Sequence, residues 1–295
     1  MIKISIIVPT HNRLELLRRK LEALEAQDLP PERFEAVVVA DGCGDGTRDF
    51  LAMYRPGYAL KWLETPGLGA ASARNRAVEQ AEGEVLLFSD DDVVLEPNAL
   101  RIHLEAQQTP AVCMGAFRYE TGEVWQPVFR RGQPHWVGLG CANTSVPAEA
   151  FRVVGGFWED LEGYGGEDLE LGYRLHHYGL PFRYLAEARG IHAGGPSMAD
   201  LSKAHSAGRQ AMHIYLHHRN AALGLELGVH PALLHVKMAV LPWTKRLLGP
   251  RGDYELAYAC GAWAARHEDL PGFASHGAED PPASPKDSGG EDGSS

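Results

Sequence analysis

Three consecutive aspartates, Asp90, Asp91 and Asp92, directly follow the apolar run EVLLFS and form a concentrated acidic turn. Neighbouring carboxylates repel one another, and a hard divalent cation relieves that repulsion. Mg²⁺ or Mn²⁺ is commonly held by one or two carboxylates, with phosphate oxygens at its other positions. The alternative is an acidic turn that only caps the helix expected at 97–107. The turn therefore predicts either a metal–phosphate site or a helix cap.

A second acid, Asp41, opens the glycine-rich turn DGCGDGT at residues 41–47. A carboxylate in this position can accept hydrogen bonds from a ribose or a nucleobase, as it does in dinucleotide-binding folds. The glycines do not fit G-x-G-x-x-G, so a nicotinamide-dinucleotide fingerprint is absent. The competing interpretation of Asp41 is a side chain that only closes its own turn.

Two arginines lie close to these acids in the sequence. Arg13 follows the first apolar run, and Arg74 lies within GAASARNRAVEQAE, after a glycine-rich loop. A guanidinium binds two phosphate oxygens in a planar fork, so either arginine could hold a diphosphate. Either could equally be an exposed arginine on a helix surface.

The fourth candidate is the acid pair Glu167-Asp168, which follows Gly165-Gly166 in the segment 155–179. The glycines allow a close approach of the backbone, and the pair begins a helix whose apolar positions are leucines. One of the two acids could be a general base that takes a proton from a hydroxyl nucleophile. Carboxylates in a first helical turn are also stabilised by the helix dipole, so a purely structural role is the alternative.

A single histidine, His192, lies among small residues in ARGIHAGG. An imidazole nitrogen suits Mn²⁺ in a mixed oxygen and nitrogen shell. A structural histidine is the alternative interpretation.

The elements that must position these residues are short apolar strands alternating with helices. Strands are expected at 3–9, 36–40, near 59–64 and at 84–89, and Asn12 is expected to cap the first helix. Fully apolar strands that alternate with helices indicate a parallel sheet covered on both faces. Ligands of such sheets bind outside the carboxyl ends of the strands, where Asp41 and the acidic turn are placed.

Composition narrows the function classes. The chain has 295 residues and a formal net charge of −11, which argues against a general nucleic-acid binder. Its cysteines are far apart, with no C-x-x-C pair, so reduced thiols and a cytoplasmic location are expected. They are Cys43, Cys113, Cys141 and Cys260. The apolar stretch 221–241 is interrupted by polar residues and is too polar for a membrane helix.

Charge is unevenly distributed near the end of the chain. Residues 271–295 contain five acids and one lysine among many Gly, Pro and Ser, so we expect a disordered acidic tail. Residues 201–252 carry seven Lys or Arg against one acid. This basic segment, with Trp243 and many leucines, could lie on an anionic membrane surface. The alternative is a pair of helices that pack over the preceding domain with a solvated basic face.

Taken in order, these motifs resemble the family 2 glycosyltransferases of the GT-A fold. The resemblance covers about residues 3–195 and rests on four ordered segments and the isolated His192. The segments are SIIVPTHNR (5–13), VVVADGCGDGT (37–47), GLGAASARNRAVEQAEGEVLLFSDDDV (67–93), CANTSVPAEAFRVVGGFWEDLEGYGGEDLELGYRLHHYG (141–179) and the isolated His192. The resemblance implies a metal-dependent inverting enzyme that moves a sugar from a nucleotide-diphosphate sugar to an acceptor hydroxyl.

The resemblance also implies a role for each matching residue. Asp168 would be the catalytic base, with Glu167 beside it. The nucleotide sugar would be bound by Pro9, Arg13, Asp41, Arg74 and Asp91. The cation, Mn²⁺ or Mg²⁺, would be held by Asp90, Asp92 and His192. Two departures from the family pattern stand out: Ala40 replaces the first of two acids at its strand end, and the triple aspartate fits the DxD element in two phases.

Acceptor recognition is expected from the second half of the chain. Trp125, Trp136 and Trp158 are candidate stacking surfaces for a sugar ring, with core-facing aromatics as the alternative. The acceptor could be a glycan, a lipid-linked molecule or a small molecule, and no nucleic acid is expected as a partner. The rival function is a non-catalytic nucleotide-sugar or glycan-binding protein on the same fold. Such a binder would need neither a base nor a full metal shell.

The expected fold is α/β of the GT-A type, with a Rossmann-like, mostly parallel central sheet flanked by helices and a C-terminal helical extension. We expect a catalytic domain at 1–200, with a donor half at about 1–110 and an acceptor half at about 111–200. A basic helical extension at 201–270 and the disordered tail at 271–295 complete the expected organisation.

Overall fold

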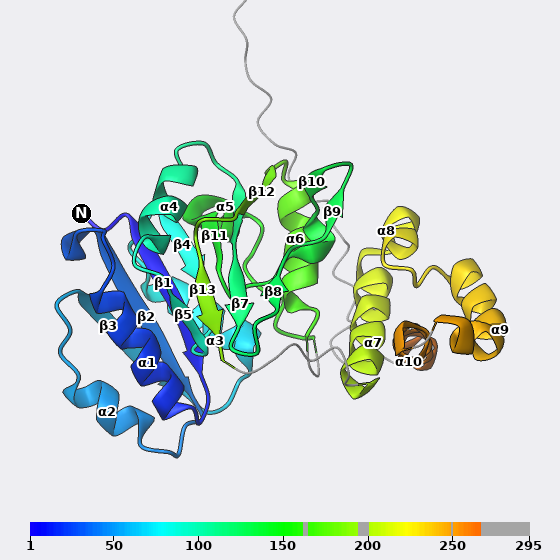
Figure 1. Cartoon of the computed structure of the whole chain (residues 1–295), viewed down its shortest axis with the longest axis horizontal. Coiled ribbons are helices and arrows are strands. Elements are labelled where there is room, and N and C mark those ends of the chain that lie inside the picture. The colour runs from blue at the N-terminus through cyan, green and yellow to red at the C-terminus, as the bar shows by residue number, and fades with distance from the viewer. Residues whose placement is uncertain (162–164, 194–200, 249, 267–295) are drawn as a thin grey trace, which may run out of the picture.

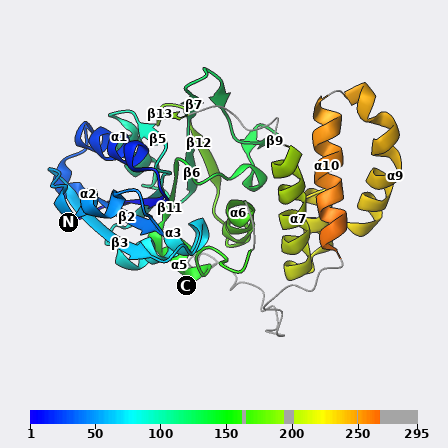
Figure 2. The same cartoon turned by 90° about the horizontal axis from the view of Figure 1, so that it is seen from below.

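The computed structural model describes residues 1–161, 165–193, 201–248 and 250–266. The tail expected at 271–295 lies outside these described residues. Within them, a seven-stranded sheet forms the centre, and four helices follow it at the C-terminal end (Figures 1 and 2).

The central sheet is mostly parallel, as expected, with one strand reversed. In spatial order its strands are β12 (Phe182–Leu185), β6 (Val112–Gly115), β11 (Thr144–Pro147), β4 (Val85–Phe88), β1 (Ile4–Thr10), β2 (Phe34–Asp41) and β3 (Ala59–Thr65). Strand β11 is antiparallel to both of its neighbours, β4 and β6. Its Thr144 pairs with Phe88, so the segment before β11 runs alongside the residues that follow β4.

Smaller β elements flank the central sheet. A second sheet has the spatial order β5 (Val93–Leu95), β13 (Gly190–His192), β7 (Phe117–Tyr119) and β8 (Val124–Trp125). A hairpin is formed by β9 (Phe129–Arg130) and β10 (Gln133–Pro134), and short 3₁₀ turns occupy Pro31–Arg33 and Trp136–Gly138. Pairing of His192 with Val93 across β13 and β5 brings the histidine beside the acidic turn.

The helices cover both faces of the central sheet and then extend beyond it. Those of the sheet region are α1 (Leu14–Glu25), α2 (Thr47–Met53), α3 (Ala70–Gln80), α4 (Ala99–Ala106), α5 (Ala148–Val153) and α6 (Glu167–His177). Those of the extension are α7 (Leu201–His218), α8 (Ala221–Glu226), α9 (Pro231–Leu248) and α10 (Pro250–Ala265).

Alternation along the strands divides the core between the two faces of the sheet. In β1, Ile6 faces a hydrophobic cluster with the leucines of α1, whereas Ile7 faces a cluster with Ala73 and Ala77 of α3. Both side chains are fully buried. Successive side chains of a strand point to opposite faces, so a strand buried on both sides reads as a continuous apolar run.

The first helix does not begin as expected. Asn12 does not cap the helix. Its backbone has φ 52°, and its side-chain oxygen accepts a hydrogen bond from the amide of Gly44 at 2.7 Å. The amide of Leu14 instead donates to Asp45 Oδ2 at 2.9 Å. The cap therefore comes from the neighbouring βα loop, because an acceptor from another loop satisfies an exposed helical amide equally well.

The helical extension packs against α6 in the second half of the sheet region. Figures 1 and 2 show α7 beside α6, on the side remote from β3, with α9 and α10 beyond it. Met212 and Ile214 of α7 belong to the same hydrophobic cluster as Leu171 and Leu175 of α6. Within the described residues, none of the helices combines the length and the hydropathy needed to cross a membrane.

Candidate active site

The loop after β2 is organised by Asp41. Its Oδ1 accepts hydrogen bonds from Thr65 Oγ1 at 2.6 Å and from the amides of Gly67 and Leu68 at 3.0 and 2.7 Å. Its Oδ2 accepts from the amide of Gly69 at 2.8 Å. Burial alone would raise the pKa of Asp41, but these donors outweigh it and hold the pKa below its ordinary value. Asp41 thus folds the glycine-rich loop 65–69 around its own carboxylate.

The middle residue of the acidic turn, Asp91, is also held by protein donors. Thr10 Oγ1 donates to its Oδ2 at 2.7 Å, and Arg13 Nη1 to its Oδ1 at 3.2 Å. Burial raises the pKa of Asp91 to about 6, with a smaller contribution from the neighbouring acids, while Thr10 and Arg13 act in the opposite direction. Pro9 precedes Thr10 at the carboxyl end of β1, and Arg13 follows it by three residues. Three of the expected nucleotide-sugar residues, Pro9, Arg13 and Asp91, thus lie near this strand end.

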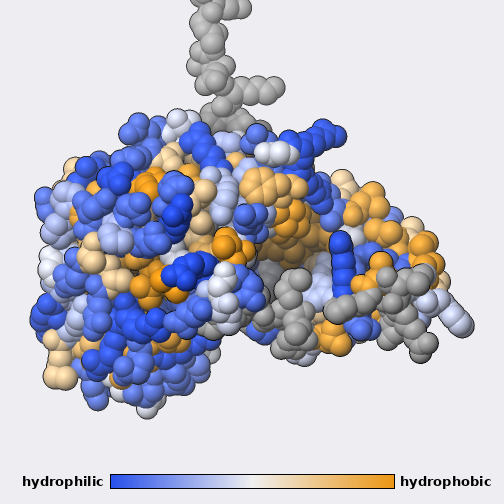
Figure 3. Space-filling model, viewed as in Figure 1, coloured by the Kyte–Doolittle hydropathy of each residue, from blue (hydrophilic) through white to orange (hydrophobic). Residues whose placement is uncertain are grey.

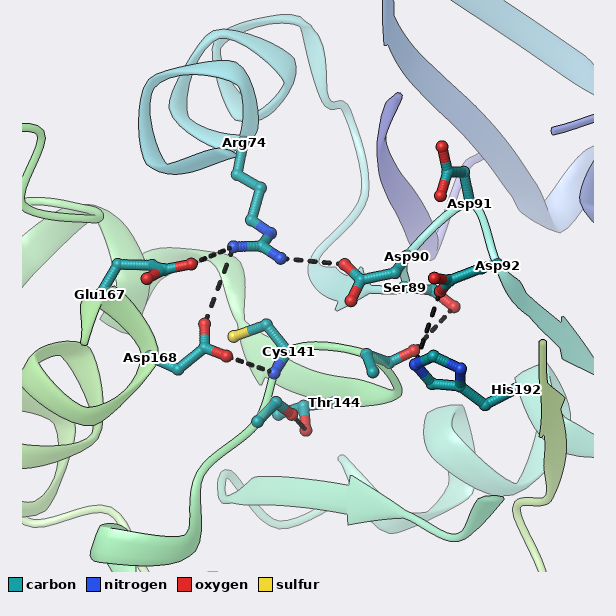
Figure 4. Close-up of polar contacts among 12 residues, drawn as sticks. Arg74, Ser89, Asp90, Asp91, Asp92, Cys141, Thr144, Glu167, Asp168 and His192 are labelled. Carbon is teal, nitrogen blue, oxygen red and sulfur yellow. Dashed lines mark hydrogen bonds and ion pairs between the residues drawn. The ribbon is translucent and has the colours of Figure 1, made fainter. Parts of the chain in front are cut away.

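Arg74 joins the acidic turn to the acid pair of α6. Its Nη2 lies 2.9 Å from Asp90 Oδ1, and its Nη1 lies 3.2 Å from Glu167 Oε1 and 3.8 Å from Asp168 Oδ1. Figure 4 shows the guanidinium between Asp90 on one side and the two acids of α6 on the other. Burial by itself would lower the pKa of Arg74, but the surrounding acids raise it well above its ordinary value. The structure therefore brings together four residues that the sequence places in three separate motifs.

The two oxygens of Asp168 differ in their surroundings. Oδ2 accepts a hydrogen bond from the amide of Cys141 at 3.0 Å. Oδ1 is buried without a hydrogen-bond partner and lies 3.8 Å from Nη1 of Arg74 (Figure 4). Burial, reinforced by the charge of Glu167, raises the pKa of Asp168 above its ordinary value. An oriented carboxylate with one unbonded oxygen and a raised pKa has the properties of a general base.

The start of α6 is fixed by a close approach of α7. Gly166 has φ 100°, and a Cβ at this position would lie 2.7 Å from Cβ of Gln210. A side chain at 166 would therefore force α7 away from the acid pair. This contact identifies what the backbone approaches at Gly166, whereas a Cβ at Gly165 would meet nothing within 4 Å.

Asp92 and His192 form the part of the site that suits a cation. Asp92 Oδ1 is buried without a hydrogen-bond partner and lies 3.7 Å from His192 Nε2. His192 Nδ1 lies 2.8 Å from the carbonyl of Ala193, which can only accept, so Nδ1 carries the proton and Nε2 keeps its lone pair. A carbonyl acceptor behind the ring is the usual support of a metal-binding histidine.

Asp92 and His192 supply only part of a cation's coordination shell. Among the described residues, no three His, Cys, Asp or Glu side chains gather as a metal site. Asp90, which the sequence also assigns to the metal, faces Arg74 instead. Asp92 and His192 therefore fit a cation whose other positions are filled by phosphate oxygens and water.

The three tryptophans expected at the acceptor have different surroundings. Trp136 is 2% exposed and packs in the core, edge to face with Tyr173 at 5.6 Å. The expectation that its ring stacks on a sugar is therefore wrong, because that ring is enclosed. Trp125 is half-buried and stacked on Phe117, and Trp158 is half-buried with its ring 4.1 Å from that of His217.

Sequence reasoning missed several residues that build this site. Thr10 and the amide of Cys141 hold carboxylates of the candidate site, and no pattern in the sequence identifies them. Lys20 is different, because its spacing from Leu17 and Leu24 places it on the buried face of α1. A lysine at an apolar position of a helix is a signal that could have been read.

Two family models together cover most of the sheet region. Residues 5–149 match the model described as glycosyl transferase family 2. Residues 129–193 match the model described as N-terminal domain of galactosyltransferase.

Named relatives match part of the chain. A validoxylamine A glucosyltransferase of Streptomyces hygroscopicus subsp. limoneus is 34% identical, over 64% of this chain and 51% of that protein. The poly(ribitol-phosphate) beta-N-acetylglucosaminyltransferase TarS of Staphylococcus aureus strain Mu50 is 41% identical, over 34% of this chain and 18% of that protein. The chain thus spans about half of the length of the validoxylamine A glucosyltransferases that it matches.

Solved structures share the fold. The mannosyltransferase PcManGT from Pyrobaculum calidifontis, in complex with GDP-Man and Mn²⁺, has a TM-score of 0.59 at 20% identity, covering 90% of this chain and 86% of that chain. S. aureus TarS 1–349, in complex with UDP-GlcNAc, has a TM-score of 0.57 at 20% identity, covering 90% and 92% of the two chains. At this level of identity the likeness establishes the fold and nothing finer.

Proposed function

The chain belongs to glycosyl transferase family 2, and on that premise we propose that it transfers a sugar from a nucleoside-diphosphate sugar to an acceptor hydroxyl, with inversion at the anomeric carbon. One observation carries the proposal: the buried guanidinium of Arg74 contacts both Asp90 of the acidic turn and the Glu167-Asp168 pair. The acids expected to serve the donor and the acceptor thus meet in one site. The nucleotide sugars in the complexes of PcManGT and TarS support a donor of this class.

The proposed base is Asp168. Its Oδ1 has no hydrogen-bond donor to compete for its lone pairs, whereas Oδ2 is fixed by the amide of Cys141. Oδ1 accepts the proton of the acceptor hydroxyl while the hydroxyl oxygen attacks the anomeric carbon and the bond to the diphosphate oxygen breaks. A single base and direct attack on the face opposite the leaving group give inversion. Glu167 supports the base by keeping its pKa raised.

The leaving diphosphate is assigned to the arginines. Arg74 pairs with Asp90 of the acidic turn, and Arg13 pairs with Asp91 and Asp92. Diphosphate oxygens can replace carboxylate oxygens in the planar fork of a guanidinium, because both present two acceptors at similar spacing. On donor binding, the two arginines thus stabilise the negative charge that the diphosphate gains.

A divalent cation, Mn²⁺ or Mg²⁺, is assigned to Asp92 and His192. Asp92 offers an unbonded oxygen, and His192 offers the lone pair of Nε2. When bound, the cation supplies Lewis-acid stabilisation of the diphosphate leaving group. Asp90 is retained as a further ligand in the proposal, which requires it to leave Arg74 when the diphosphate binds.

The nucleoside is assigned to the carboxyl ends of β1 and β2. Pro9, Asp41 and Asp91 remain the proposed contacts of the base and ribose. Asp41 already accepts four hydrogen bonds, so its main contribution is the shape of the loop 65–69 beside the nucleoside. Trp125 and Trp158 remain the proposed acceptor surfaces, and the acceptor is a glycan, a small molecule or a lipid-linked hydroxyl.

A panel of nucleotide diphosphates and nucleotide sugars, screened by thermal shift with and without Mn²⁺, tests the donor assignment. A ligand that binds only the native state raises the melting temperature, so the matching nucleotide should stabilise the chain and do so more strongly with Mn²⁺. Transfer is then measured as release of the free nucleoside diphosphate in the presence of candidate acceptors. Binding without release under any acceptor would favour the non-catalytic sugar-binding alternative.

We also propose that α9 attaches the protein peripherally to an anionic membrane. Val236, Val240 and Trp243 recur at helical spacing and are exposed, Trp243 by 85%. Figure 3 shows apolar side chains over α8 and the neighbouring part of α9. Helix α9 contains no acid, and Lys245 and Arg246 follow Trp243 in its last turns. An exposed apolar stripe with tryptophan and flanking basic residues is typical of helices that lie in a lipid headgroup region.

Charge favours lipid over a second copy of the chain as the occupant of this face. The segment 201–252 has a net charge of +6, so two copies apposed through it would repel one another. Co-sedimentation at low salt with vesicles rich in phosphatidylglycerol should pellet the protein, and Trp243→Ser should reduce pelleting. Neutral phosphatidylcholine vesicles are the control. Absence of pelleting would exclude the membrane, and concentration-dependent dimers would assign the face to a second copy.

A further inference from the structure

Lys20 is a buried cation that lies beneath the acidic turn. It belongs to the face of α1 that packs on the sheet, together with Leu17, Leu21 and Leu24, and it is 0% exposed. An amine at such a position loses its hydration, whereas a methionine would fill similar space without that cost. Because burying the amine costs its hydration, the contacts made by its Nζ indicate its role.

The head of Lys20 contacts both ends of the acidic turn. Its Nζ donates to Ser89 Oγ, immediately before Asp90, and to the carbonyl of Val93 at 2.7 Å, immediately after Asp92. Burial lowers the pKa of Lys20 to about 7 against the opposing effect of the three aspartates. The amine carries enough hydrogens for both bonds whether it is charged or neutral. The two bonds therefore clamp the turn from below in either state.

Hydrogen bonds link Lys20, through Ser89, to the segment that orients Asp168. Ser89 Oγ, which accepts from Lys20, donates in turn to the carbonyl of Ala142 at 3.1 Å. The preceding residue, Cys141, supplies the amide that holds Asp168. One side chain of α1 is thus linked through Ser89 to the acidic turn and to the acid pair of α6.

We propose that Lys20 is a positioning residue that holds the backbone of the acidic turn in the position that the donor site needs. This inference rests on the proposed function for the identity of the donor, but the position of the turn can be measured without turnover. Lys20 touches neither the sugar nor the diphosphate in this scheme. It acts through the backbone of residues 89–93.

The test compares Lys20→Met with Leu24→Met. Both place methionine on the buried face of α1, and the second does so away from the turn. Hydrogen exchange of the free protein should be about tenfold faster at the amides of 89–93 in Lys20→Met and unchanged in Leu24→Met, the effect expected when a buried anchor of the turn is lost. With the donor that binds wild type, kcat/KM should fall at least about tenfold in Lys20→Met and stay within about twofold in Leu24→Met.

Unchanged exchange at 89–93 in a folded Lys20→Met variant would overturn the proposal. So would equal effects of the two methionine variants on exchange and on kcat/KM. If Lys20→Met does not fold, Ser89→Ala replaces it, because it removes one of the two oxygens that bind Lys20 to the turn. It should accelerate exchange in the same segment. If wild type bound no nucleotide, the proposed function would fail, while the exchange comparison would still decide the role of Lys20.

Discussion

Asp41 lies at the end of β2, and Asp168 lies in the first turn of α6. The two aspartates differ in how many hydrogen bonds their carboxylates accept and in the direction of their pKa shifts. Asp41 accepts four hydrogen bonds, and its pKa is lowered. Asp168 accepts one, keeps an unbonded oxygen, and has a raised pKa. Donors to the charged form stabilise a carboxylate, whereas burial without them leaves it basic. The comparison separates an aspartate that builds a loop from one that can take a proton.

The largest expected effect comes from Asp168→Asn. The amide cannot accept the proton of the hydroxyl, so turnover should fall by about 10²–10⁴, the usual contribution of a general base. Donor affinity should stay near that of wild type, as measured by calorimetry. Asp49→Asn is a matched control, because Asp49 is an exposed acid in the first turn of another helix, α2. If the turnover of Asp168→Asn is close to that of the control, Asp168 is not the general base.

The next largest effect concerns Asp92, whose unbonded oxygen resembles that of Asp168 but faces an imidazole. Chelation by EDTA should abolish transfer, and Mn²⁺ should restore it. His192→Gln should raise the Mn²⁺ concentration for half-maximal activity by about 10–100-fold, as expected for loss of a ligand or its support. His235→Gln, at an exposed histidine of α9, is the control. Full activity after exhaustive chelation would contradict the assignment of a cation to this pair.

Asp41→Asn should affect stability more than chemistry. Asparagine replaces one carboxylate oxygen with NH₂, which cannot accept a hydrogen bond from the amides of the loop 65–69. The free energy of unfolding should therefore fall by about 1–3 kcal/mol. Urea denaturation monitored by tryptophan fluorescence measures this loss. Asp168→Asn should show no such loss, since only one amide bonds its carboxylate. A stable Asp41→Asn variant would show that the loop does not depend on those donors.

The smallest expected effect is the pH dependence of stability. The folded-state pKa of Asp168 is raised, so its ionised form destabilises the fold above that pKa, and the penalty disappears as the pH falls towards the unfolded value of about 3.9. Asp41 has a lowered folded-state pKa, so its contribution is present above about 3.9 and is lost as the pH falls through the lower folded value. Denaturation of wild type and Asp168→Asn between pH 4 and 7 should therefore converge at the acidic end. A difference that does not change with pH would contradict the raised pKa.

The sequence predicted where these acids lie along the chain but not what surrounds them. Asp41 and the acidic turn were expected at strand ends, because apolar runs of strand length stop just before them. The hydrogen bonds that distinguish Asp41 from Asp168 come from Thr65, Gly67 and Cys141, whose roles depend on the folded path of the chain. Local patterns carry no information about such partners.

The remaining differences have the same origin. The reversed direction of β11 depends on how the chain returns to the sheet, which the composition of the strand does not encode. The cap of α1 comes from Asp45, more than thirty residues away, and Asn12 lies next to the helix without capping it. The sequence leaves Trp136 as either a sugar-stacking or a core-facing aromatic, and packing against Tyr173 encloses its ring.

The pH profile of the single-turnover rate at saturating donor tests the central claim most directly, because it reports the protonation of the base in the complex. The account predicts an acid limb whose midpoint lies above about 3.9, the ordinary value for an aspartate. It also predicts that the residual rate of Asp168→Asn lacks this limb. A wild-type rate that stays level down to about pH 4, or the same limb in Asp168→Asn, would contradict the assignment of Asp168 as the base.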